Sequence, residues 1–328
     1  MHSLDSTARR EHADLLAREG LLDRAGQRAA RVWIRERIDW VGWVDGLLLA
    51  IGATLGVAGI AATFGLHWAK IPTLGKFALL EAILGAGVLA TWRVGLDCRA
   101  GKVLLTACSA MVGVLLAVYE QSYPIGGDRL NLMLLWAVLI AGWVAIGRFS
   151  PHWMLFVWIS NLAADDLVSR HILPGTSFYY SAMGLLDAGF LIAAERGRRH
   201  GMEWLEGSWH RILLWGVTVW FLSTPAMWLA TWKGATRWEL GGTLLWLAML
   251  ALGHRQYRRI SPDLTALSIG AASVGCVMQA LVLRWLFDGG SGTDRSWFLA
   301  ALAAVTISGA LGAWLRSVAS EIQEVTGD

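Results

Sequence analysis

Among the carboxylate side chains that lie within or beside long apolar segments, where an ionised group is costly, six fall in the predicted outer half or at the outer rim. Such a group marks either a functional site or a buried ion pair, so these residues are the first candidates for chemistry. Glu81 and Asp187 lie well inside their apolar segments. The six carboxylates are Glu81, Glu120, Asp128, Asp165, Asp166 and Asp187.

Two interpretations of this set remain open. In the first, the carboxylates line an outward-facing polar cavity with Asn161, Arg129 and Arg284, and bind a cation, a proton or a polar headgroup. In the second, they pair with arginines and backbone groups and hold the helices together. No basic residue lies within the apolar segment of Asp187, which favours the first interpretation for that residue. The adjacent pair at 165 and 166 fits a hydrated rim better.

The composition is that of a membrane protein. Of 328 residues, 55% are hydrophobic and 16% are charged, whereas a soluble domain carries about 25% charged residues. The apolar residues form long runs with few charges, as transmembrane helices do. The net charge of +3 comes from basic residues in short loops between these runs, which is unlike a nucleic-acid-binding surface. We therefore expect an all-α, polytopic membrane protein that contacts the lipid bilayer and binds no nucleic acid.

Ten apolar segments predict about ten transmembrane helices, each needing about 20 residues to cross the hydrocarbon core. Segments 152–168 and 238–253 are the weakest, the first because it contains Asn161 and two aspartates, and the second because its charge-free run is short. The segments are 44–66, 74–92, 103–120, 130–147, 152–168, 176–194, 212–232, 238–253, 264–285 and 296–316.

The basic residues predict the orientation of these helices. With the N-terminus inside the cell, 20 of the 28 Lys and Arg residues lie on the cytoplasmic side, which is the positive-inside pattern. If segments 152–168 and 238–253 did not cross, Arg196, Arg198 and Arg199 would face outward. Ten spans with both termini in the cytoplasm are therefore the better prediction.

Residues 1–42 predict a short cytoplasmic helical hairpin before a transmembrane domain at 43–318 and a short cytoplasmic tail at 319–328. Eight arginines and the lack of a continuous apolar core argue against a signal peptide. The first helix is expected to stop at Gly20, and Asp23 is expected to cap the second. The hairpin either touches anionic lipid or packs as a solvated pair on the transmembrane domain.

Signatures of catalysis are scarce in this sequence. His152 and His254 have no partner at metal-ligand spacing, and no nucleophile elbow or Walker loop is present. The sequence therefore assigns no catalytic, metal-binding or cofactor-binding residue and favours a protein that is not an enzyme. A lipid-handling enzyme with scattered catalytic groups beside His152 or Asp187 is a further alternative.

The turn Tyr123-Pro124-Ile125-Gly126-Gly127-Asp128 leads into a helix that contains Leu134-Leu135-Trp136-Ala137. In these residues the chain resembles the bacterial membrane-protein family called domain of unknown function 2157, although Pro124 replaces the glutamine of the family's turn. Gly20-Leu21-Leu22-Asp23 and Arg148-Phe149-Ser150-Pro151 also fit, so the resemblance covers residues 10–165. It implies a multispanning protein of the bacterial inner (cytoplasmic) membrane with no assigned activity.

The leading functional hypothesis is transport or binding of a small solute, an ion or a lipid headgroup through the outward-facing cavity. In this hypothesis Asp187 and Glu81 are the deep carboxylates, and Glu120, Asp128 and Arg129 form the mouth. The alternative is a non-catalytic membrane scaffold, or an accessory subunit, that binds another membrane protein of the cell envelope.

Overall fold

The computed structural model describes residues 71–123, 129–169, 177–231, 236–287 and 294–327, together with four single residues nearer the N-terminus. The chain divides into two compact units, Met1–Pro72 and Thr73–Asp328. In the first unit, Asp23 Oδ1 accepts a hydrogen bond from Gly26 N at 2.6 Å, as expected of a helix cap. The rest of the predicted hairpin and the segment 44–66 lie outside the described residues.

The described part of the second unit consists of nine α-helices, with one short 3-10 helix, one π-helix and no strand. Each predicted segment from 74–92 to 296–316 coincides with one α-helix, so the all-α fold is confirmed here. The last helix also continues to Gly327, through the residues predicted as a tail. The α-helices are α4 (Thr73–Val94), α5 (Arg99–Ser122), α6 (Arg129–Gly147), α7 (Ser150–Leu167), α8 (Ser177–Arg199), α9 (Ser208–Thr231), α10 (Arg237–Arg255), α11 (Leu264–Phe287) and α12 (Asp294–Gly327).

Six helices are long and apolar enough to cross a membrane, namely α4, α5, α8, α9, α11 and the greater part of α12. The fold is therefore that of a polytopic helical membrane protein. Helices α7 and α10 are long enough but less apolar, and they correspond to the two weakest predicted segments. Helix α6 adds a shorter apolar stretch, Leu132–Gly147. The count of ten spans stays a prediction.

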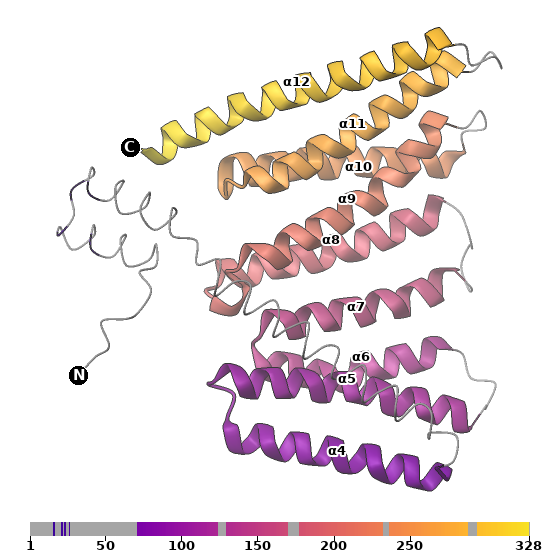
Figure 1. Ribbon diagram of the computed structural model, residues 1–328, viewed down its shortest axis with the longest axis vertical. Coiled ribbons are helices and arrows are strands. Elements are labelled where there is room, and N and C mark those ends of the chain that lie inside the picture. The colour runs from indigo at the N-terminus through magenta and orange to yellow at the C-terminus, as the bar shows by residue number, and fades with distance from the viewer. Residues whose placement is uncertain are drawn as a thin grey trace. The chain divides into compact units, whose positions relative to one another are not determined.

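Successive helices from α4 to α12 run in opposite directions, so their connections fall alternately at two ends of the bundle (Figure 1). One of these ends, at which α4, α6, α8, α10 and α12 all finish, is called the basic end. It contains the 3-10 helix Glu203–Leu205 and the π-helix Gln256–Ile260. The arginines that name it are Arg93, Arg148, Arg196, Arg198, Arg199, Arg255, Arg258 and Arg259.

Polar side chains cap two of the helices. Thr236 and Glu239 form a capping box at the start of α10, away from the basic end. At the basic end, Asp263 Oδ1 accepts hydrogen bonds from the backbone N–H groups of Thr265 and Ala266, at 3.0 and 3.2 Å. These bonds satisfy N–H groups that have no partner within the first turn of α11.

Helix α9 is the centre of the C-terminal part of the bundle, because it packs against α8, α10 and α11. Its Trp215 is 2% exposed and donates from Nε1 to the Ala266 carbonyl oxygen at 2.8 Å. Helix α10 passes the indole at Gly253, where an added Cβ atom would overlap the ring. Only glycine allows the two helices to approach this closely.

Helix α7 joins two parts of the apolar core. Its Ile159 belongs to a cluster formed with α5 and α6, which includes Val112 and Ile140. Its Val157 belongs to the larger cluster around Trp215, which also involves α8, α11 and α12. The polar residues of α7 therefore lie between two groups of helices, α4–α6 and α8–α12.

We expect Gly253→Ala to destabilise the protein, because the new methyl group must displace the Trp215 ring from a packed core. The free energy of unfolding should fall by about 1–3 kcal/mol. Gly241→Ala is the matched control, since it lies on the same helix with no atom within 4 Å of the added Cβ. Thermal unfolding of both variants in detergent measures the difference, and equal melting temperatures would contradict this packing.

Candidate functional site

Asn161 and Asp187 meet where α7 packs against α8. Asn161 Nδ2 donates to Asp187 Oδ1 at 2.9 Å and to the Val157 carbonyl oxygen at 3.0 Å. Asp187 is 1% exposed. It is buried because Gly184, Asp187 and Leu191 recur at intervals of three and four residues on the inner face of α8.

Two oxygen atoms of this pair have no hydrogen-bond partner among the described residues. They are Asp187 Oδ2 and Asn161 Oδ1, and both are buried. The described residues also place no arginine or lysine in an ion pair with Asp187. An ionised carboxylate buried without a counter-charge costs several kcal/mol. The pair can therefore hold a proton on the carboxylate, or a cation that oxygen atoms coordinate.

Polar groups follow the buried face of α8 from its start to its end. Ser177 Oγ donates to Glu239 Oε1 of α10, and Ser181 Oγ donates to the Ser177 carbonyl oxygen, both at 2.9 Å. Asp187 follows Ser181 by about 9 Å along the helix axis, and Glu195 lies roughly 12 Å further, at the basic end. A single apolar helix thus carries polar side chains at several depths.

Two other predicted site residues, Glu81 on α4 and Glu120 near the end of α5, are exposed. Asp165, near the end of α7, accepts a hydrogen bond from the Tyr179 hydroxyl at 2.6 Å. The structure therefore joins Asn161 to Asp187 but places Glu81 and Glu120 on the surface of other helices.

The last four predicted site residues lie at helix ends or in the connections. Asp166 is buried in the last turn of α7. Arg284 of α11 donates from Nη1 to the Leu229 carbonyl oxygen of α9 at 3.0 Å. Asp128 and the side chain of Arg129, which with Glu120 form the predicted mouth of the cavity, lie outside the described residues.

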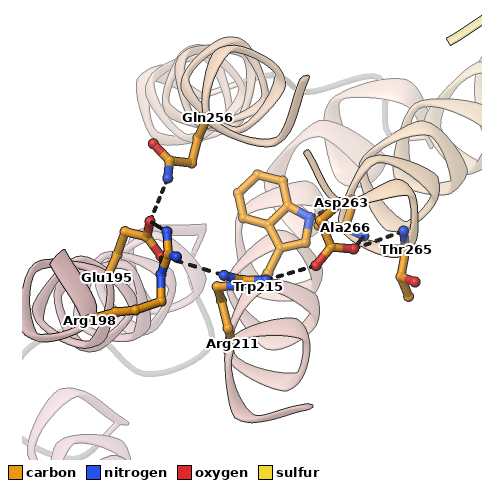
Figure 2. A network of polar contacts seen from close by, with 8 residues as sticks. All are labelled: Glu195, Arg198, Arg211, Trp215, Gln256, Asp263, Thr265 and Ala266. Carbon is orange, nitrogen blue, oxygen red and sulfur yellow. Dashed lines mark hydrogen bonds and ion pairs between the residues drawn. The ribbon is translucent and has the colours of Figure 1, made fainter. Parts of the chain in front are cut away.

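Glu195 is the centre of a second polar cluster, at the basic end (Figure 2). Its Oε1 accepts hydrogen bonds from Arg198 Nη2 at 2.6 Å and from Gln256 Nε2 at 2.7 Å. Arg199 and Arg211 approach the same carboxylate, with N–O distances of 3.7 and 3.9 Å. Three arginines from α8 and α9 therefore share one carboxylate, which is only 12% exposed.

Arg211 extends this cluster to α11. Its Nη2 donates to Asp263 Oδ2 at 3.0 Å, while the other oxygen of Asp263 caps α11 (Figure 2). The Arg211 guanidinium also lies 6.0 Å from the centre of the Tyr257 ring. Burial raises the pKa of Tyr257 to about 12, so its phenol stays neutral at physiological pH. The cluster thus ties together α8, α9, the π-helix and α11.

Glu195, Arg211 and Asp263 were not among the residues predicted from the sequence. The arginines in this part of the chain served there only to predict the orientation of the helices. A signal was present, because Glu195 precedes Arg198 and Arg199 at helical spacing. The position of Asp263, directly before an apolar run, is also typical of a helix cap.

A buried serine–histidine pair joins α5 and α7. Ser109 Oγ lies 2.7 Å from His152 Nε2 and donates to the Leu105 carbonyl oxygen at 3.1 Å. Both side chains are fully buried. The hydroxyl can donate to the Leu105 carbonyl oxygen and accept from His152, or it can donate to His152, according to the tautomer of the imidazole. The pair therefore reads as a structural link, which Trp136 of α6 strengthens by donating to the Ser109 carbonyl oxygen at 2.8 Å.

Apolar helices of membrane-spanning length around a few buried polar clusters define the class of this protein, a polytopic α-helical membrane protein. Residues 10–153 match the family described as Predicted membrane protein (DUF2157), which confirms the resemblance found in the sequence. No curated protein and no solved structure matches the chain. The family description assigns no activity, so the site must supply the argument for function.

We expect Glu195→Gln to lower stability, because Arg198, Arg199 and Arg211 would lose the negative charge that they share. The free energy of unfolding should fall by about 1–3 kcal/mol for this partly buried cluster. Glu203→Gln removes an exposed carboxylate at the same end and is the matched control. Unfolding in detergent would compare the two, and a Glu195→Gln variant as stable as the control would show that the cluster does not stabilise the fold.

Proposed function

We propose that this protein binds a proton or a small cation at the Asn161–Asp187 pair and that this binding serves ion transport. One observation carries the proposal, the buried Asp187 carboxylate with an oxygen atom that no described residue satisfies. Ionisable groups inside apolar helices are the usual elements of ion pathways and proton relays.

The position of the pair supports the proposal. Asp187, on α8, contacts Asn161 of α7, and α7 is the helix that packs against both groups of helices, α4–α6 and α8–α12. Transporters commonly place ion sites where two bundles meet, since relative movement there changes access to the site. The predicted outward-facing cavity, with Glu120, Asp128, Arg129 and Arg284, would be the outer approach to Asp187 in this proposal, whereas Glu81 is exposed on α4 and takes no part in it.

Replacing Asp187 tests the proposal directly. In proteoliposomes with a trapped pH-sensitive dye, wild-type protein should dissipate an imposed proton gradient, alone or in exchange for Na⁺ or K⁺. Asp187→Asn keeps the shape of the side chain and its bond with Asn161 but cannot bind a proton or neutralise a cation. We expect its flux to equal that of protein-free vesicles.

Glu81→Gln is the matched control, because it neutralises an exposed carboxylate on another apolar helix. Flux that survives Glu81→Gln and is lost in Asp187→Asn would assign the site to the buried pair. Loss in both variants would extend the site to the predicted cavity. Wild-type flux in Asp187→Asn would contradict ion binding at this residue.

The membrane topology is a further part of the proposal. We propose ten spans in the bacterial inner membrane with both termini in the cytoplasm. The alternating helices (Figure 1) and the arginines of the basic end support this arrangement. A fluorescent protein fused after Arg199 should therefore fluoresce in the cytoplasm. Alkaline phosphatase fused after Gly175 should be active outside it. A fusion after Arg199 that appears outside would overturn the ten-span arrangement.

The second candidate function is a scaffold that binds another membrane protein of the envelope. It is favoured by α4, which buries only Leu80 and Thr91 and leaves most of its apolar surface uncovered. Mild detergent extraction should then recover a stable partner, and deletion of residues 1–42 would release it if the N-terminal region makes the contact. Recovery of the protein alone would count against this candidate.

A further inference from the structure

A cavity of about 370 Å³ opens between α8 and α10 at the basic end. Its floor contains Trp215 of α9 and Gly253 of α10. Its apolar wall contains Ile192 of α8 and Leu252 of α10, both exposed on the outside of the bundle, and Met249. The side of the cavity nearer the middle of the helices is therefore apolar.

The other side of the cavity is positively charged. Arg196, Arg199 and Arg255 line it together with one carboxylate, that of Glu195. Arg199 is already held by Glu195 and by Gln256, the latter at 2.8 Å. Arg196 and Arg255 are exposed and form no hydrogen bond or ion pair with any described residue.

We propose that this cavity binds an anionic phospholipid. The phosphate lies between Arg196 and Arg255, at the end of the helices, and the start of an acyl chain lies over Ile192 and Leu252. Basic pockets between membrane helices hold anionic headgroups because the arginine guanidinium donates several hydrogen bonds to phosphate oxygens.

A lipid fits the cavity better than a free anion does. Free phosphate would satisfy the two arginines but would make no contact with the apolar wall of Ile192, Met249 and Leu252. An amphiphile covers both sides at once and gains the transfer free energy of the apolar contact. The site is independent of Asp187, so neither proposal depends on the other.

The experiment measures the melting temperature of the full-length protein in neutral detergent as lipid is added. Phosphatidylglycerol should raise the melting temperature, and phosphatidylcholine, whose net charge is zero, should not. In Arg196→Gln/Arg255→Gln the phosphatidylglycerol concentration for half of the effect should rise by about tenfold. Arg93→Gln/Arg259→Gln removes the same charge from the same end, outside the cavity, and should respond like wild type.

Adding inorganic phosphate instead of lipid distinguishes a bound phospholipid headgroup from a bound free anion. We expect it neither to raise the melting temperature nor to displace phosphatidylglycerol at equal concentration. If phosphate displaces phosphatidylglycerol, the cavity binds a free anion rather than a lipid, and the proposal is overturned. Equal stabilisation by phosphatidylcholine, or an unchanged response of the Arg196→Gln/Arg255→Gln variant, would overturn it as well.

Discussion

Burying a charge in an apolar bundle is costly unless an opposite charge, a set of hydrogen bonds or a bound ligand compensates it. Helix α8 shows two outcomes of this constraint. Glu195 lies near the end of the helix and is shared by three arginines and Gln256. Asp187 lies eight residues earlier, and Asn161 is its single side-chain partner among the described residues. The contrast between these two carboxylates underlies both the architecture and the proposed function.

The Glu195 cluster fixes one end of α8 to its neighbours. Arg211 carries the interaction to the cap of α11 through Asp263, and Trp215 closes the same region by its bond to Ala266. Helices α8, α9 and α11 are therefore tied together at the basic end by polar contacts as well as by packing. The Asn161–Asp187 contact, by comparison, is a single hydrogen bond between α7 and α8.

The helices could be predicted from the sequence because apolar runs of membrane-spanning length mark them directly. The nine described helices coincide with the predicted segments, and even the weakness of 152–168 and 238–253 corresponds to α7 and α10. The sequence did not predict that α12 continues to Gly327. The described turns beyond 316 are kept by contacts with other elements, such as the ion pair of Glu321 with Arg258 at 2.6 Å.

The site was harder to predict, for a physical reason. The apolar run around Asp187 shows that the carboxylate lies well inside a predicted span, but it does not show which helix lies opposite. Asn161 and Asp187 were both singled out, yet only the packing of α7 on α8 makes them partners. Glu81 belonged to the same prediction and is exposed on α4. Glu195 was overlooked because counting basic residues gives no weight to a single acid among several arginines. In the structure this carboxylate holds those arginines together.

The central claim is that the Asp187 carboxylate binds a proton or a cation inside the bundle. Infrared difference spectroscopy tests it most directly, by comparing the protein at low and high pH and with or without Na⁺ or K⁺. The account predicts a protonated carboxyl band that disappears when the proton leaves or the cation binds, and that is missing in Asp187→Asn. A difference spectrum that is the same in wild type and in Asp187→Asn would contradict it.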